Sequence, residues 1–196
     1  RDTPWKISND GRRWLVYPLV RFLFAANGIP WGKDYRIFGL PIIQKHRNST
    51  IFFGSGLQLR STVRSNPLGP NHPVIIATRQ QRAVLEVGFN FGMTGGAICS
   101  AESIIIGNNV AVGANSTITD TDFHPVDKNK RRSKPSEART AEVVIGDDVF
   151  IGMNCMVLKG VRIGKVSVVG AGSVGTKDVP SNVVVAGNPA QIIRAI

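Results

Sequence analysis

Large aliphatic residues recur every six positions along the second half of the chain. The clearest run is Ile145, Ile151, Val157, Ile163 and Val169. Glycine follows four of these five residues, and a small residue stands four positions after each of them. The same register continues upstream through Ile106, Val112 and Ile118, and before that through Val87, Met93 and Cys99. One extra residue before Ile106 resets the phase of the repeat.

A period of six does not match an α-helix, which has about 3.6 residues per turn, but it is a multiple of the strand period of two. We therefore predict an all-β solenoid in which each hexad forms one short flat face. The aliphatic residue points inward, and glycine turns the corner because it tolerates backbone angles that branched residues avoid. Three faces close a coil of about 18 residues, and stacked coils bury a continuous core.

The pattern weakens toward the N-terminus. Ile51, Leu57 and Val63 are still six apart, and residues 74–77 and 83–87 have the composition of strands, so 51–86 is expected to form irregular first coils. Residues 12–27 are apolar and aromatic and end at Gly28, which predicts a capping helix. We therefore divide the chain into a basic, aromatic N-terminal cap at 1–50 and a solenoid domain at 51–196.

One long insertion interrupts the repeat between Ile118 and Ile145. Residues 120–142 are polar and rich in Lys and Arg, which a solenoid core cannot accommodate. They are expected to form a loop extruded from one corner of a coil. Long loops on rigid scaffolds often carry function.

Charge is concentrated in the first part of the chain. The 196 residues carry a net charge of +11, but residues 1–82 hold 13 Lys and Arg against 3 Asp and Glu, a net +10. With 42% hydrophobic residues, the chain is not a disordered basic tail. No nucleic-acid motif accompanies the charge, so nucleic acid is not expected as a partner. The basic, aromatic cap could cover the open end of the solenoid and pack on a neighbouring subunit, or it could contact an anionic membrane.

Membrane-span and signal-peptide patterns bear on the cellular compartment, and the two cysteines bear on the chemistry. No apolar run reaches the roughly 18 residues of a membrane span, and no signal peptide is evident, so we expect a cytoplasmic protein that could lie at the inner face of the membrane. Cys99 and Cys155 fall on inward positions and are expected to be packing thiols. This disfavours a cysteine nucleophile.

Two motifs resemble the hexapeptide-repeat acyltransferases, a family with a left-handed parallel β-helix. They are Thr-Asp-Thr-Asp-Phe-His-Pro at 119–125, and the segment at 171–180 followed by Ala-Gly-Asn-Pro-Ala at 186–190. The resemblance is strong over 85–196 and is closest to the O-acetyltransferases of sugars, capsules and lipopolysaccharide. It implies polysaccharide biosynthesis, acetyl-coenzyme A as the acyl donor, and a homotrimer with active sites between subunits.

His124 is the candidate catalytic residue. Acyl transfer to a hydroxyl needs a base that takes the alcohol proton, and imidazole suits this task near neutral pH. The resemblance places His124 in the catalytic loop, with Asp120 and Asp122 beside it as supporting residues. From the residues alone, a surface histidine without a role is an equal alternative.

The resemblance also suggests how coenzyme A is bound. The small residues Gly152, Gly170 and Ala171 would let the pantetheine arm lie close to the backbone. Lys177 and Arg194 are the candidates for binding its phosphates, since basic groups pair with phosphate oxygens. Ordinary surface charge is the alternative for both.

For the acceptor we single out Asn90 and His72, although a structural turn is the favoured explanation of His72. The predicted function is transfer of an acetyl group from acetyl-coenzyme A to a hydroxyl of a sugar or glycan acceptor. The alternatives are N-acetylation of a nucleotide-linked amino sugar and a non-catalytic structural solenoid. A zinc-dependent carbonic anhydrase of the same fold would need three histidines, but His46 and His72 lie outside the regular coils, so no metal is expected.

Overall fold

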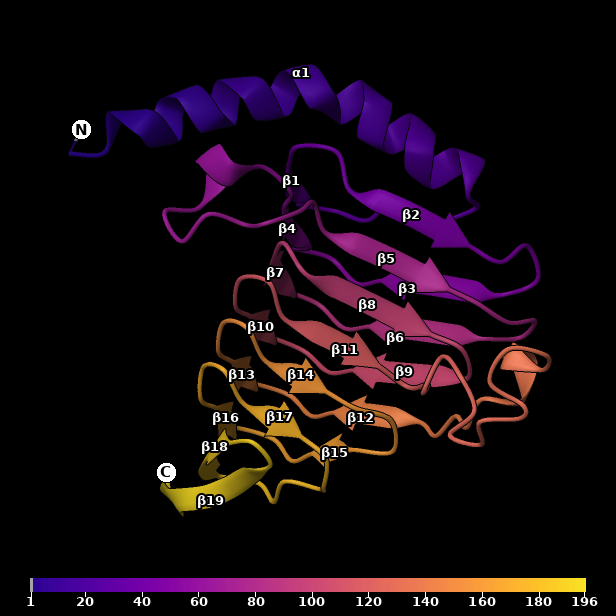
Figure 1. Ribbon diagram of the computed structural model, residues 1–196. Coiled ribbons are helices and arrows are strands. Elements are labelled where there is room, and N and C mark those ends of the chain that lie inside the picture. Colours follow the sequence, from indigo (N-terminus) through magenta and orange to yellow (C-terminus); the bar gives the residue numbers. More distant parts are fainter. Residues whose placement is uncertain (1) are drawn as a thin grey trace.

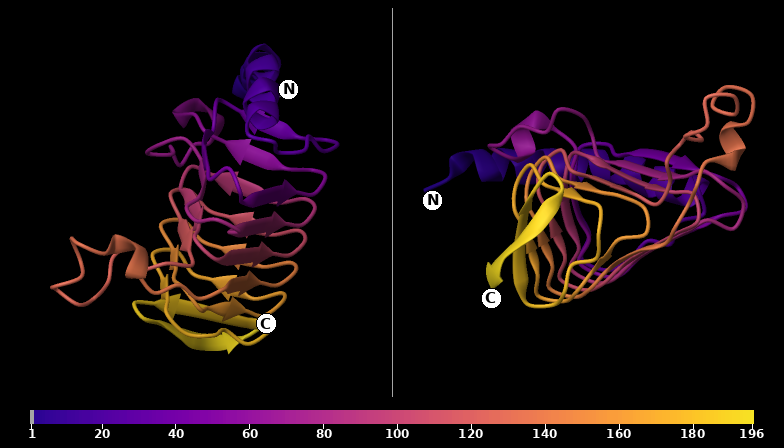
Figure 2. Two further views of the ribbon diagram at one scale, coloured as in Figure 1. Left: turned by 90° about the vertical axis from the view of Figure 1, so that its right-hand side faces the viewer. Right: turned by 60° about the horizontal axis from the view of Figure 1, so that its bottom comes forward.

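The computed structural model describes residues 2–196 and forms a parallel β-helix of triangular cross-section (Figures 1 and 2). Three sheets make the three walls, and within each wall the strands of successive coils pair in parallel. The arrangement is consistent with the left-handed β-helix expected from the hexads.

The first wall is an eight-stranded sheet. In spatial order it contains β1 (Arg36–Phe38), β4 (Gln58–Arg60), β7 (Gly92–Thr94), β10 (Ala111–Val112), β13 (Phe150–Ile151), β16 (Val168–Val169), β18 (Val183–Gly187) and β19 (Ala190–Ala195). All neighbours pair in parallel except β18 and β19, which are antiparallel.

The other two walls have six and five strands. The six-stranded sheet contains β2 (Ile42–Lys45), β5 (Ile75–Thr78), β8 (Ala97–Ser100), β11 (Thr117–Thr119), β14 (Met156–Val157) and β17 (Val174–Gly175). The five-stranded sheet contains β3 (Thr50–Phe53), β6 (Val84–Val87), β9 (Ser103–Ile106), β12 (Val143–Ile145) and β15 (Arg162–Ile163).

The connections between walls form three edges, which organise the site. The glycine edge joins the eight-stranded to the six-stranded sheet through 39–41, 61–74, 95–96, 113–116, 152–155 and 170–173. The loop edge joins the six-stranded to the five-stranded sheet through 46–49, 79–83, 101–102, 120–142 and 158–161, and continues at 176–178. The asparagine edge joins the five-stranded to the eight-stranded sheet through 54–57, 88–91, 107–110, 146–149 and 164–167.

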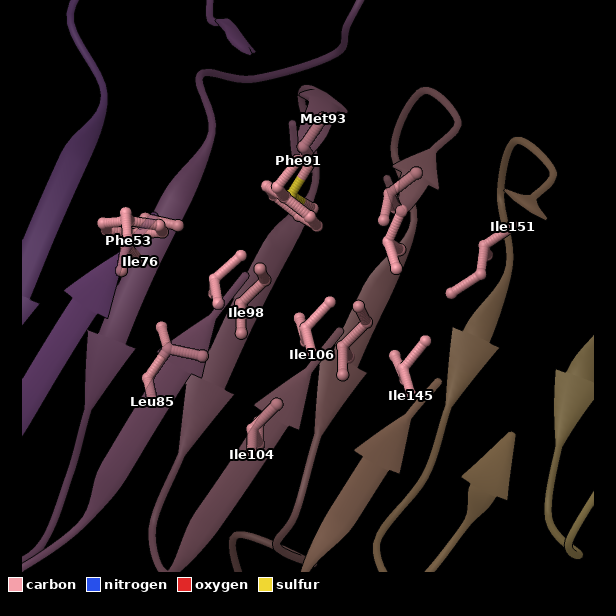
Figure 3. Packing of buried hydrophobic residues seen from close by; sticks show 14 of the residues in the cluster. Phe53, Ile76, Leu85, Phe91, Met93, Ile98, Ile104, Ile106, Ile145 and Ile151 are labelled. Atoms are coloured by element: carbon pink, nitrogen blue, oxygen red, sulfur yellow. The ribbon is translucent and has the colours of Figure 1, made fainter. Parts of the chain in front are cut away.

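The predicted inward positions form the core. The five aliphatic residues of the clearest hexad run are each at most 3% exposed, and the small residues that follow them are also buried. Figure 3 shows side chains such as Leu85, Ile98, Ile106 and Ile145 pointing into the space between the walls. The register fails at Val63, which is 68% exposed in the 3₁₀ helix η1 (Val63–Ser65), because the connection 61–74 leaves the coil there.

The N-terminal helix is present and longer than expected. It is α1 (Pro4–Ala26), whereas the sequence pattern predicts 12–27. Asn9, Val20 and Phe24 are its buried residues, and the Phe24 ring lies 6.1 Å from that of Phe53 in the first coil. The helix therefore covers the N-terminal end of the solenoid (Figure 1).

The sheets begin before residue 51. Strand β1 pairs with β4, and β2 pairs with β5, so residues 36–45, which the sequence pattern places in the cap, contribute to two walls. The short strands there carry no repeated hexad and are held by pairing with the following coil. Within residues 2–196, no helix is long and apolar enough to cross a membrane.

Candidate active site on the loop edge

His124 lies at the start of the segment 120–142, which connects β11 with β12 and leaves the solenoid wall (Figure 2). Its backbone N–H donates to the carbonyl of Asp122 at 2.7 Å, and Phe123 between them adopts a φ of 61°. Pro125, which follows, is buried. A tight turn with a buried end therefore presents His124 as an exposed residue.

Asp120 fastens the beginning of this segment to the preceding coil. Its fully buried carboxylate accepts hydrogen bonds from the backbone N–H groups of Ala101 at 2.6 Å, Glu102 at 2.8 Å and Ser103 at 2.7 Å. The Ser100 hydroxyl donates a fourth bond at 3.0 Å. Asp120 thus supports the loop through the backbone of the neighbouring coil.

Asp122 fastens the loop to the following coil. Its carboxylate lies 2.8 Å from the Nζ atom of Lys159, and both side chains are about 30% exposed. Its backbone N–H donates to the carbonyl of Arg139 at 3.0 Å, which closes the neck of the loop. The two acidic residues therefore hold the beginning of the loop to the preceding and the following coil, and each carboxylate is engaged by a group other than the His124 ring.

A small hollow adjoins the loop on the side of the preceding coil. It has a volume of about 300 Å³ and is lined by residues that include Arg79, Thr121, Phe123 and Pro135. The Arg79 guanidinium lies 5.0 Å from the centre of the Phe123 ring, in a cation–π contact. A cation next to a polar concavity is suited to an anionic or hydroxyl-rich molecule.

Lys177 is on the same edge as His124. Its connection, 176–178, is two coils beyond the one that carries the loop, and Lys177 is exposed. Since stacked strands are about 4.8 Å apart, two coils correspond to about 10 Å. The loop edge therefore forms a column with His124, Lys159 and Lys177 in successive coils.

The small residues predicted to face coenzyme A are on a different edge. Gly152 is buried, and a Cβ atom there would lie 2.6 Å from the backbone nitrogen of Ala171, so coil stacking requires this glycine. Gly170 is less tightly enclosed, since a Cβ atom there would lie 3.0 Å from the Cβ atom of Ala186, and Ala171 is exposed. This column is on the glycine edge, across the six-stranded wall from the loop edge.

Arg194 is exposed on β19, and its Nη1 donates to the carbonyl of Ala195 at 3.0 Å. Because β19 pairs with β18 at the C-terminal end of the eight-stranded wall, Arg194 belongs to neither column. The structure therefore distributes the five predicted cofactor residues over three places on one chain.

The predicted acceptor residues occupy the two remaining edges. Asn90 has a φ of 55° and donates from Nδ2 to Oδ1 of Asn109 at 3.1 Å, and Asn109 donates to Asp148 at 2.9 Å. It is thus part of a ladder of side chains along the asparagine edge. His72 lies on the glycine edge, where its Nδ1 is 2.8 Å from the carbonyl oxygen of Pro73. One chain does not bring Asn90, His72 and His124 together.

Both thiols are buried away from the loop tip. Burial raises the pKa of the Cys99 thiol to about 11, and it also raises the pKa of Cys155. The Cys155 Sγ atom lies 3.1 Å from the carbonyl oxygen of Gly170. A protonated, enclosed thiol is a poor nucleophile. Among residues 2–196, no group of three or more His, Cys, Asp and Glu side chains is placed to hold a metal ion.

Sequence reasoning missed Lys159 and Arg79. Both are corner residues on the loop edge: Lys159 lies one coil after the loop and Arg79 two coils before it. Counting hexads across the insertion places 158–160 next to the loop. The stacking register of the coils could therefore have identified Lys159 as a neighbour of the loop. The positive charge of Lys159 then suggests an ion pair with Asp122, and the aromatic ring of Phe123 suggests a cation–π contact with Arg79.

Two family models match the repeats. The bacterial transferase hexapeptide (six repeats) matches residues 142–174, and the hexapeptide repeat of succinyl-transferase matches residues 95–120. Both matches lie within the stacked coils, on either side of the loop.

Two curated proteins are similar to parts of the chain. Galactoside O-acetyltransferase of Lactococcus lactis subsp. lactis (strain IL1403) is 44% identical over 107 residues, which cover 55% of this chain and 49% of that protein. The 2,3,4,5-tetrahydropyridine-2,6-dicarboxylate N-acetyltransferase of Clostridium perfringens (strain SM101 / Type A) is 60% identical over 53 residues, or 27% of this chain and 22% of that protein. The matches therefore span about half the length of the first relative and less than a quarter of the second.

Several solved structures resemble nearly the whole chain. One of them is a hexapeptide-repeat containing acetyltransferase from Vibrio cholerae O1 biovar eltor, complexed with acetyl coenzyme A. The superposition covers 96% of this chain and 85% of that one, with a TM-score of 0.53 and 25% sequence identity.

Proposed function

We propose that the chain is a hexapeptide-repeat acetyltransferase that transfers an acetyl group from acetyl-coenzyme A to a hydroxyl of a sugar or glycan. The observation that carries this proposal is the presentation of His124 as an exposed residue on a loop that Asp120 and Lys159 fasten to the coils on either side. Similarity to a galactoside O-acetyltransferase and to an acetyltransferase that binds acetyl coenzyme A supports the donor and the class of acceptor.

His124 acts as the general base in this proposal. Its imidazole takes the proton of the acceptor hydroxyl as the oxygen attacks the thioester carbonyl. The tetrahedral intermediate then collapses, the carbon–sulfur bond breaks, and the imidazolium returns the proton to the departing thiolate. No acyl-enzyme is required, in agreement with the burial of both cysteines.

The donor is proposed to lie along the loop edge. The connections that carry His124 and Lys177 lie on the same edge, and two coils of stacking separate them by about 10 Å, so a thioester at His124 can extend toward a cation at Lys177. The other four predicted cofactor residues cannot join this column on one chain. Three of them, Gly152, Gly170 and Ala171, lie on the glycine edge, and Arg194 lies on β19. If they contact the donor, they do so from an adjoining subunit.

We further propose a homotrimer with active sites between subunits. His124, Asn90 and His72 lie on three different edges of one triangular prism, so they can share a site only across an interface between prisms. The extruded segment 120–142 and the hollow beside Arg79 are then available to bind the acceptor. The N-terminal segment remains a cap outside this site.

The test is release of free thiol from acetyl-coenzyme A in the presence of galactosides, other sugars and polysaccharides. His124→Ala should reduce the rate about 100-fold or more with little change in thermal stability, because an exposed base is lost. His46→Ala is the matched control, since His46 lies on the same edge three coils earlier. Full turnover by His124→Ala would refute the assignment.

N-acetylation is the second candidate, and the similarity to an N-acetyltransferase supports it. The same assay separates the two reactions when each sugar is paired with its amino analogue. An O-acetyltransferase acts on the sugar without an amine, whereas an N-acetyltransferase releases thiol only with the amino sugar. A structural solenoid would release none with any acceptor.

A further inference from the structure

The outward surface of α1 is apolar, although the helix already buries its opposite side. Leu15 is 80% exposed, Phe22 73%, Trp14 64% and Leu19 56%. At about 3.6 residues per turn, these residues share one side of the helix, opposite the buried Val20 and Phe24. We call the surface formed by Ile7, Trp14, Leu15, Leu19 and Phe22 the outer stripe.

The outer stripe faces away from the solenoid at its N-terminal end. Figure 1 shows α1 lying across that end, and Figure 2 shows the walls extending from it in one direction. A flat surface could therefore approach the stripe without meeting the walls or the loop edge. Large exposed apolar patches usually mark a site of interaction.

Charged residues on α1 indicate what covers the outer stripe. Arg12 and Arg21 are exposed and border it on its two sides. Asp10 is the single acidic residue within Pro4–Ala26, and it lies 3.9 Å from Arg13. An apolar stripe bordered by arginines and containing tryptophan is typical of a helix that lies in the headgroup region of an anionic membrane.

We propose that the outer stripe of α1 binds the surface of an anionic membrane, with the helix in the plane of the interface. Trp14, Leu15, Leu19 and Phe22 enter the boundary between headgroups and acyl chains, while Arg12 and Arg21 pair with lipid phosphates. The net charge of +10 on residues 1–82 adds a long-range attraction to the same leaflet.

A second copy of the chain is a weaker occupant of this surface. Two outer stripes placed face to face would bring four exposed arginines, and two N-terminal regions of +10 each, close together. Like charges at that distance oppose association, whereas an anionic lipid surface neutralises them.

The experiment is flotation of the full chain with vesicles of equal parts phosphatidylglycerol and phosphatidylcholine, and with vesicles of phosphatidylcholine alone. At about 0.05 M salt we expect binding to the anionic vesicles, reduced several-fold at about 0.5 M. Leu15→Ser with Phe22→Ser should lower the partition coefficient about tenfold or more, because two buried apolar side chains are lost. Arg12→Gln with Arg21→Gln should lower it several-fold at low salt.

A matched control lies at the opposite end of the solenoid. Ile192 and Ile193 are 58% and 61% exposed on β19, and replacing both with serine should leave vesicle binding unchanged. Thermal unfolding of each variant verifies folding.

Failure of the wild type to bind anionic vesicles at low salt would overturn the proposal, as would equal binding by the Leu15/Phe22 variant. A smaller assembly mass for that variant, without vesicle binding by the wild type, would assign the stripe to a second copy. Because the assay requires no acetyl transfer, its outcome is independent of the proposed enzyme activity.

Discussion

Asp120 shows how much one side chain contributes to the position of the loop. Its carboxylate accepts hydrogen bonds from three consecutive backbone N–H groups and one hydroxyl in a fully buried location. Asp120→Ala would leave these donors without an acceptor. We expect the free energy of unfolding, measured by urea denaturation, to fall by about 3 kcal/mol.

Asp147 provides the control for that measurement. Its exposed carboxylate accepts one backbone N–H, from Asn108 at 2.6 Å, where water can replace it. Asp147→Ala should cost about 1 kcal/mol or less. Equal losses in the two variants would mean that burial of the carboxylate is not what makes Asp120 important.

Lys159 acts on the loop from the following coil. Because it pairs with Asp122, two residues before His124, Lys159→Ala should free that part of the loop and lower kcat several-fold. The KM for acetyl-coenzyme A should change little, and Lys159→Arg should recover most of the rate. Lys165→Ala, an exposed lysine on the asparagine edge, is the control. A change confined to KM would instead assign Lys159 to donor binding.

Sequence reasoning identified these acidic residues but not their partners. Asp120 and Asp122 were predicted to support the loop that carries His124, and their carboxylates contact residues of the neighbouring coils. The donors to Asp120 come from residues 100–103, just where the extra residue before Ile106 shifts the hexad phase. A pairing between coils depends on register, and register is least certain where the repeat is interrupted.

At the scale of elements, the loop is a separate unit with a closed neck. Thr121 and Thr140 form an antiparallel bridge, and Lys130 and Lys134 both pair with Glu137 at the tip, in and beside η2 (Pro135–Glu137). Residues 127–137 are exposed, so the core does not depend on them.

Replacing residues 128–137 with a short Gly-Ser turn tests this independence. We expect the free energy of unfolding to change by about 1 kcal/mol or less, because loop length costs little entropy and no core contact is removed. The KM for the acceptor should rise, as measured by thiol release at saturating donor. Loss of the cooperative unfolding transition would contradict the placement of these residues outside the core.

Only the second part of the helix was predicted, because the two parts of α1 differ in composition. Residues 12–27 are apolar and aromatic, whereas Ser8, Asn9, Asp10 and Gly11 are weak helix formers. Tertiary contacts override that preference, since the buried Asn9 side chain donates to the carbonyl of Arg64 at 2.8 Å. A contact 55 positions away in the sequence has no local signal.

At the scale of the whole molecule, the repeat determines how closely the coils approach one another. A Cβ atom at Gly113 would lie 2.5 Å from the backbone nitrogen of Met153 in the next coil, whereas one at Gly92 would meet nothing within 4 Å. Gly113→Ala should therefore lower the free energy of unfolding by about 2 kcal/mol or more, since backbone must shift. Gly92→Ala should change it by about 0.5 kcal/mol or less, by the same denaturation experiment.

The fold was more predictable than the site for a related reason. Each hexad repeats the same inward and corner positions, so many residues report one geometry, and the core positions from Val87 to Val169 are confirmed. The candidate site, by contrast, consists of single residues on particular edges, and no repeated pattern reports their positions. Asn90, His72 and Arg194 were chosen individually, without a periodic pattern to place them relative to His124.

The antiparallel pairing of β18 and β19 has a consequence for assembly. A stack of parallel coils exposes unpaired N–H and C=O groups at its last coil, where another solenoid could add and continue the stack. Strand β19 is the last strand of the eight-stranded sheet and runs antiparallel to β18, with which it forms five residue pairs in the register Val183↔Ala195 to Gly187↔Ala190. With α1 across the first coil, this reversal leaves the eight-stranded sheet ending in an antiparallel strand, so a parallel strand of another molecule cannot continue this wall in register.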